Sequence, residues 1–243
     1  VVSFVMMGLL FALPLQAQAV HALDAQASGL RLLPLIGGLM VTAVPSGVLA
    51  ARVGSRAVVA AGMAVLTAGL AWGATTAVTA GSWSGAGWTA VCGAGLGLAL
   101  PTAMDGALGA LPADAEGTGS AVLQALRMVG SSFGAAILGA VLNAGYRNGL
   151  PADAPALRGL PAEAVAAARD SVVGAASVAE RIGSSELLTA ARGAFVRGFD
   201  SSLWVAAALA LVGAALALVV MTGRRAAPLA DPADSAHEPE HAR

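Results

Sequence analysis

The sequence predicts an all-α membrane protein, a bundle of helices that crosses the bilayer several times. Hydrophobic residues make up 57% of its 243 residues and charged residues only 11%, whereas a soluble domain carries about 25% charged residues. The mean hydropathy is +0.78. The apolar runs are twice the length of a barrel strand and do not alternate, which argues against a β-barrel. We therefore expect a polytopic membrane helix bundle.

Six stretches are apolar over the roughly 20 residues that a helix needs to cross about 30 Å of hydrocarbon. Polar or glycine-rich breaks separate them, at 21–29, 52–56, 81–87 and 111–119. We expect the six apolar stretches to lie in the lipid bilayer. The six predicted spans lie at about 1–20, 30–50, 57–77, 86–108, 119–144 and 200–222.

The long loop 145–199 differs from the other breaks because it carries most of the charged residues between spans. Prolines interrupt its first part, and Ala-rich helices are expected at 161–182 and 185–198. Apolar residues recur there at three- and four-residue steps, opposite charged ones. Two interpretations stay open: an amphipathic helix on the bilayer surface, or a solvated helical hairpin that caps the bundle.

The composition and the motifs argue against several function classes. The net charge of −1 predicts no nucleic-acid partner, and Cys92, the one cysteine, allows neither a disulfide nor a cysteine-based metal site. His237 and His241 lie in the tail 223–243, which is expected to be disordered, so we predict no metal. No Ser–His–Asp arrangement or phosphate-binding loop is present in the sequence. We predict neither a cofactor nor enzymatic activity.

Two ionisable residues, Asp105 and Arg127, lie inside predicted spans. A charge there costs about 2.5–3.5 kcal/mol on insertion scales, so it needs a reason. If the chain turns near Pro112, both residues lie roughly 9–12 Å deep on the same side, at 1.5 Å of rise per residue. The two interpretations are a salt bridge between them, or an arginine that reaches carbonyl groups at the end of another helix.

Glycines four residues apart predict close helix packing, because small residues let the backbones of membrane helices approach. A smooth face of this kind would also let helices slide or rock during a conformational cycle. The three predicted packing pairs are Gly69 with Gly73, Gly93 with Gly97, and Gly130 with Gly134.

Three stretches of the chain contain motifs that are similar to those of one transporter family. Residues 28–59 contain the turn G-V-L-A-A-R-V-G-S-R, and residues 160–220 contain the run A-A-R-G-A-F. The chain resembles the C-terminal six-helix half of fourteen-span drug:proton antiporters of the major facilitator superfamily, the EmrB/QacA type. In the turn, the matching positions include Gly47, Arg52, Gly54 and Arg56, while Ala51 replaces an acid. In residues 93–143 they are Pro101, Asp105, Gly109, Pro112, Gly119, Ser120, Arg127 and Gly130.

This resemblance implies an alternating-access exporter of small hydrophobic or cationic compounds, with protons as the coupling ion. It implies that the loop with Arg52 and Arg56 is cytoplasmic and controls gating; the placement of the arginines alone leaves the orientation open. The expected location is the plasma membrane, with the N-terminus and the tail cytoplasmic and 145–199 outside.

The chain begins at Val1 within an apolar run, so we expect a missing N-terminal half that forms the other wall of the substrate cavity. The alternative is a six-helix membrane protein that does not transport, either a regulatory or assembly partner or the remnant of a decayed transporter.

Overall fold

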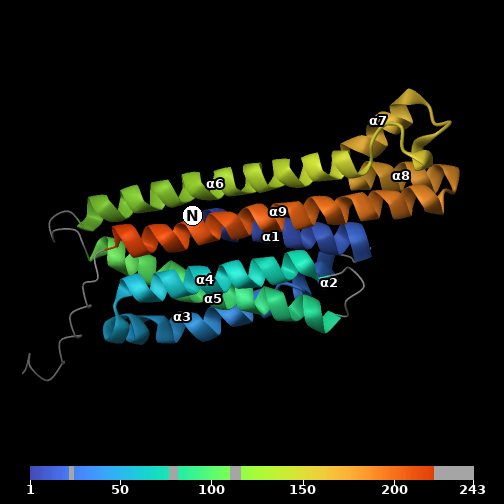
Figure 1. Ribbon diagram of the computed structural model, residues 1–243. Coiled ribbons are helices and arrows are strands. Elements are labelled where there is room, and N and C mark those ends of the chain that lie inside the picture. Colours follow the sequence, from blue (N-terminus) through green and yellow to red (C-terminus); the bar gives the residue numbers. More distant parts are fainter. Residues whose placement is uncertain (22–24, 77–81, 110–115, 222–243) are drawn as a thin grey trace, which may run out of the picture.

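A computed structural model describes residues 1–21, 25–76, 82–109 and 116–221. Its long helices lie side by side, and within these ranges there is no strand, which confirms the predicted all-α bundle (Figure 1). The long helices are α1 (Val2–His21), α3 (Leu33–Val53), α4 (Ser55–Thr75), α5 (Ser82–Leu108), α6 (Glu116–Gly149) and α9 (Ser185–Val220). The shorter elements are α2 (Ala25–Leu30), the 3-10 turn η2 (Pro155–Leu157), α7 (Ala162–Asp170) and α8 (Val172–Ile182).

Five helices of the described part are long and apolar enough to cross a bilayer. They contain the whole of the predicted spans at 30–50, 86–108 and 119–144, and all but the last two residues of those at 57–77 and 200–222. The predicted span at 1–20 corresponds to α1, whose described apolar part, Val2–Gln18, is shorter than the other five. A sixth crossing by α1 stays a prediction. The tail 223–243 lies outside the described residues.

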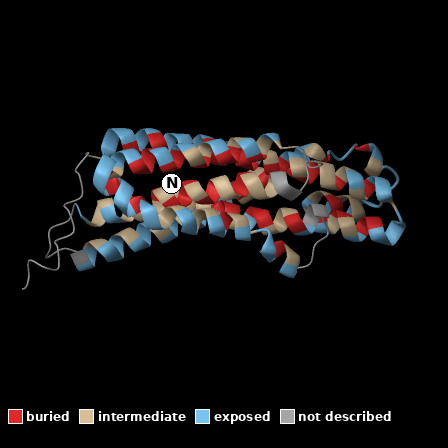
Figure 2. Cartoon of the chain, turned by 90° about the horizontal axis from the view of Figure 1, so that it is seen from below, coloured by how far each residue is buried: buried red, intermediate tan, exposed pale blue. Residues whose placement is uncertain are grey.

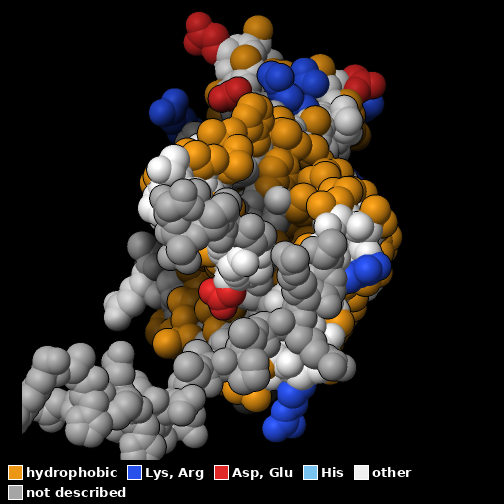
Figure 3. All heavy atoms as spheres, turned by 90° about the vertical axis from the view of Figure 1, so that its left-hand side faces the viewer, with side chains coloured by type: hydrophobic (Ala, Val, Ile, Leu, Met, Phe, Trp, Pro, Cys, Tyr) orange, Lys and Arg blue, Asp and Glu red, His pale blue; other side chains and the backbone are white. Residues whose placement is uncertain are grey.

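Helices α4, α5 and α9 form the interior of the bundle. Helix α4 packs against both α5 and α9, α3 packs mainly on α5, and α6 packs on α9 and α1. Consequently α3 and α6 bury the smallest share of their apolar stretches, 11% and 17%, against 39–50% for α4, α5 and α9. Figure 2 shows exposed residues along the outer helices, and in Figure 3, which looks onto one end of the bundle, hydrophobic side chains form much of the coloured surface.

The loop predicted at 145–199 is shorter in the structure, because both flanking helices continue into it. Helix α6 runs on to Gly149 and α9 begins at Ser185, so their 34 and 36 residues measure roughly 51 and 54 Å at 1.5 Å per residue. Hydropathy marks where the bilayer ends, whereas the Ala-rich run after Ser185 keeps the helix going. Both helices therefore extend roughly 20 Å past a 30 Å hydrocarbon layer.

The predicted helix at 161–182 is broken into α7 and α8. Ser171 has extended backbone, and its hydroxyl oxygen accepts a hydrogen bond from the Gly174 N–H at 3.0 Å. This side chain satisfies one of the free amides at the start of α8, as an N-cap does. Helices α7 and α8 pack against each other at the extended ends of α6 and α9 (Figure 1). In the described chain they form a cap on the bundle, which corresponds to the second of the two interpretations.

Candidate functional site

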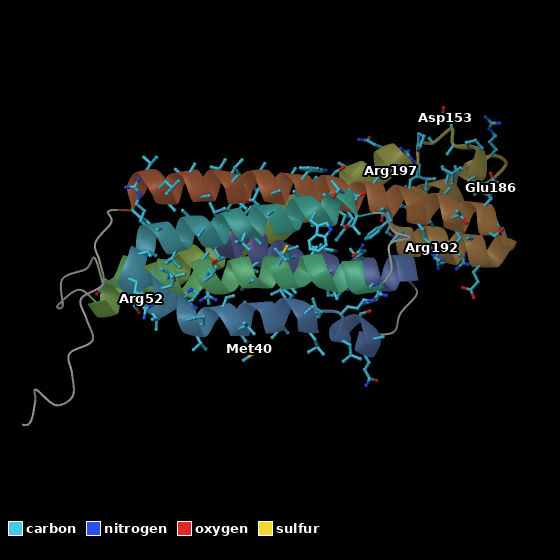
Figure 4. The ribbon with its side chains drawn as sticks, turned by 60° about the horizontal axis from the view of Figure 1, so that its bottom comes forward. Met40, Arg52, Asp153, Glu186, Arg192 and Arg197 are labelled. Carbon is cyan, nitrogen blue, oxygen red and sulfur yellow. The ribbon has the colours of Figure 1, made fainter. Side chains whose placement is uncertain are left out.

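The turn between α3 and α4 contains the residues that the family resemblance assigns to gating. Gly54 has φ 91°, a backbone conformation that favours glycine, and its N–H donates to the Ala50 carbonyl at 2.9 Å. Arg52 and Arg56 flank it and are exposed, as is Gly47 about two helical turns before Gly54. Within the described residues neither arginine contacts a carboxylate. Figure 4 places Arg52 at the end of the bundle opposite the cap.

Asp105 and Arg127 do not form an ion pair in the part of the chain that the structure describes. Asp105 is exposed near the end of α5, and Arg127 is half-buried on α6. Helix α5 packs on α3 and α4, whereas α6 packs on α9 and α1, so the two helices scarcely touch. Equal depth along two helices therefore does not bring these side chains together here, and their pairing stays a prediction.

The predicted packing glycines of α4 and α5 lie at contacts between helices. A Cβ atom at Gly69 would be 2.8 Å from the Cys92 sulfur, and one at Gly73 would be 2.7 Å from the Trp88 ring. Both distances are shorter than any ordinary carbon contact. Helices α4 and α5 thus approach through the absence of side chains on α4.

Helix α5 packs closely on both sides. A methyl group at Gly93 or Gly97 would overlap the Leu35 or Leu39 carbonyl of α3, whereas one at Gly95 would be 2.6 Å from the Leu66 nitrogen of α4. The Thr42 hydroxyl adds a hydrogen bond across the first interface, donating to the Ala94 carbonyl at 2.9 Å.

The two glycines of the last predicted pair, Gly130 and Gly134 of α6, differ in their surroundings. Gly134 faces the Phe4 backbone of α1, so that a side chain there would overlap it. Gly130, one turn earlier, has no described atom within 4 Å of the position that a Cβ would take. No contact made by the described residues accounts for Gly130 as a packing residue.

A cavity of about 410 Å³ lies between α1, α6 and the junction of α7 with α8. No pattern in the sequence predicts this cavity, because it depends on how a distant loop folds back over α6. Its walls are mainly apolar and include three aromatic side chains, Phe11, Tyr146 and Phe195. Its polar lining residues are Asn143, Asp170 and Ser171.

Three side chains attach the cap to the end of α6, and a fourth joins α9 to α6. The Tyr146 hydroxyl donates to the Ala168 carbonyl at 2.6 Å, and the Asn143 amide is 3.4 Å from the Asp170 carbonyl. Arg169 donates to the Leu150 carbonyl at 3.1 Å, and Arg197 to the Gly149 carbonyl at 2.8 Å. Cationic donors at these carbonyls suit the negative end of the α6 dipole. The cap is therefore held to the bundle by hydrogen bonds as well as by packing.

Metal chemistry finds no support among the described residues, which contain no cluster of three or more His, Cys, Asp or Glu side chains. His237 and His241 lie outside the described ranges. What the arrangement offers is a bundle with closely packed glycine interfaces, a cationic turn at one end, and an apolar cavity beneath a cap at the other.

Comparison with known proteins identifies the relatives of this chain. It is 33% identical over 226 residues to the tetracenomycin C resistance and export protein of Streptomyces glaucescens, covering 89% of this chain and 41% of that protein. It is 35% identical to the multidrug efflux pump LfrA of Mycolicibacterium smegmatis, over 50% of this chain and 24% of the pump. It is 30% identical to the multidrug resistance protein Stp of Mycobacterium tuberculosis, over 59% of this chain and 26% of that protein.

The chain is a homologue of major facilitator drug-efflux transporters. The resemblance of the motifs is thereby confirmed at the level of the family. No family model matches the chain. This transporter homologue spans less than half the length of each of these three relatives. Its long apolar helices agree with a multi-pass membrane protein.

Proposed function

We propose that this chain is the C-terminal half of an exporter that moves small hydrophobic or cationic compounds across the plasma membrane by alternating access, with protons as the coupling ion. The observation that carries the proposal is the similarity to an export protein over 89% of the chain. A missing N-terminal half would form the other wall of the transport cavity. The proposal includes no enzymatic step.

The helix interfaces support a role in conformational change. Several contacts of α5 with α3 and α4 are formed by a glycine against backbone atoms of the other helix, beside packed side chains such as Trp88 and Cys92. At the glycine positions no side chain interlocks with the neighbouring helix, so a shift there needs no large change of side-chain rotamer. The exposed apolar faces of α3 and α6, which include Met40 in Figure 4, provide surface for lipid or for the missing half.

The proposed orientation has the α3–α4 turn and the C-terminal tail in the cytoplasm and the cap outside. Arg52 and Arg56 lie at the proposed cytoplasmic end. The loop 145–199 also carries arginines, so the proposed orientation rests on the family resemblance and not on arginine placement. We propose gating for the Gly47–Arg56 turn. For Asp105 and Arg127 we propose a structural or gating pairing in a state other than the one described here.

The test is dye export from cells. The reading frame that contains this chain is expressed in a host that lacks its own efflux pumps, and cells loaded with rhodamine 6G are followed by fluorescence. We expect lower dye accumulation than with an empty vector, and loss of the difference when a protonophore is added. Equal accumulation, with the protein present in the membrane fraction, contradicts export and favours a membrane protein that does not transport.

A further inference from the structure

The cavity under the cap lies near the surface of the bilayer and not at its midplane. Asn143 is roughly 40 Å along α6 from Glu116, at 1.5 Å per residue, whereas the hydrocarbon layer is about 30 Å thick. Ala136, on the same wall, is about 30 Å along the helix. The cavity therefore extends from the edge of the hydrocarbon layer into the region of the lipid head groups.

One wall of this cavity is flat. Ala135, Ala136 and Gly139 of α6 present almost no side chain, and Phe11 of α1 lies beside them. A Cβ at Gly139 would be 3.9 Å from the Phe11 ring, an ordinary contact distance, and would meet no other described atom within 4 Å. Small residues beside an aromatic ring form a smooth apolar surface against which a planar ring can pack.

The other side of the cavity is polar and carries one formal charge. Asp170 is the single ionisable acid of the lining, which contains no arginine. Asn143 uses its amide nitrogen toward the Asp170 carbonyl, so its oxygen remains an acceptor. The Ser171 oxygen accepts from Gly174, which leaves its O–H to donate. A carboxylate with these neighbours favours a cationic ligand over an anionic one.

We propose that this cavity is a binding site for a planar aromatic cation, with the ring system packed against Phe11 and the small residues of α6 and the cationic group toward Asp170. The volume of about 410 Å³ falls within the 300–1,000 Å³ of sites that hold drug-sized ligands. The inference rests on the proposed function: the site would hold an exported compound at the outer surface, beneath the cap. It would be separate from the midplane cavity between two halves.

The steric test fills part of the cavity with a side chain. The purified chain in lipid nanodiscs is titrated with rhodamine 6G, and binding is followed by fluorescence anisotropy against empty discs. Ala136→Phe places a ring in the cavity and is expected to weaken binding at least tenfold. Ala144→Phe is the matched control, because Ala144 is equally exposed on α6 and does not line the cavity. Equal binding by both variants overturns the proposal.

The electrostatic test separates charge from shape. Asp170→Asn is expected to weaken rhodamine 6G binding about fivefold, which corresponds to a partly exposed ion pair, and to leave the neutral aromatic N-phenyl-1-naphthylamine unaffected. Asp153→Asn, which removes an exposed acid of the cap that is not in the lining, is the control. The substitution is conservative and lies at the surface, so this arm remains informative if Ala136→Phe does not fold. Unchanged rhodamine 6G binding by Asp170→Asn overturns the assignment of a cation.

Export by cells is measured in parallel, so that the two proposals fail separately. If the wild type does not export the dye but Ala136→Phe and Asp170→Asn weaken its binding, the proposed function is contradicted and the site is supported. Export together with binding that ignores both Ala136→Phe and Asp170→Asn contradicts the site and leaves the proposed function standing.

Discussion

Single glycines determine how closely α5 approaches its two neighbours. Gly93 and Gly97 lie against carbonyl groups of α3, and Gly95 lies against the backbone of α4. Lipid tails are as apolar as the side chains, so helices in a bilayer gain most from close van der Waals packing. A methyl group at any of these positions would have to push a backbone away.

Gly93→Ala is therefore expected to lower the thermal stability. The added methyl would overlap the Leu35 carbonyl, and overpacking of this kind costs about 1–3 kcal/mol. Gly37→Ala is the control, since a Cβ at Gly37 meets nothing within 4 Å among the described atoms. The measurement is the unfolding midpoint in detergent by tryptophan fluorescence. An unchanged midpoint for Gly93→Ala would show that the α3–α5 contact is looser than described.

At this scale the sequence predicted spacing but not direction. Four-residue steps indicated which glycines share a helix face, yet nothing in them told which neighbour the face would meet. Gly130 shows the limit, because it follows the same pattern as Gly134 and has no described neighbour. Asp105 and Arg127 show it too: their depth follows from helix rise, whereas their proximity depends on which helices are adjacent.

Among the elements, α6 and α9 are the ones whose length the sequence underestimated. Their outer parts carry charged residues, such as Arg192 and Arg197, which lower the hydropathy without ending a helix. Arg197 and Arg169 cap α6 at its C-terminal carbonyls. The cavity arises at this end from the folding of α7 and α8 over α6. Contacts between segments so distant in the chain leave no local signature.

Arg197→Gln is expected to loosen the end of α6. It removes the hydrogen bond to the Gly149 carbonyl, worth about 1 kcal/mol or less for an exposed charged donor. Hydrogen exchange should become faster at 146–150. Arg147→Gln, which removes an exposed arginine of the same helix end with no bond to a described residue, provides the comparison. If both variants exchange at the same rate, Arg197 does not stabilise this end.

Considered as a whole, the molecule has two chemically different ends. The α3–α4 turn, with Arg52, lies at one end, and Asp153, Glu186, Arg192 and Arg197 lie at the other (Figure 4). The membrane class followed from composition, because a chain with so few charged residues cannot cover a water-exposed surface with them. The helical character followed from the length of the apolar runs. The assignment of each end to a side of the membrane followed from the family resemblance and awaits measurement.

Thiol labelling in cells tests that assignment. Asp153→Cys is expected to react with a membrane-impermeant maleimide in intact cells, and Arg56→Cys only after lysis, because the proposed orientation puts the cap outside. Both native residues are exposed. The unsubstituted chain serves as background, since Cys92 is buried against α4. Labelling of Arg56→Cys in intact cells would reverse the orientation.

The extension of α6 and α9 beyond the bilayer has a mechanical consequence. Two uninterrupted rods of roughly 50 Å act as lever arms with the cap attached to their ends. A small tilt of these helices inside the membrane becomes a larger displacement at α7 and α8. A pair of spin labels, one on the cap and one on the opposite end, would therefore register motions too small to resolve within the bundle itself.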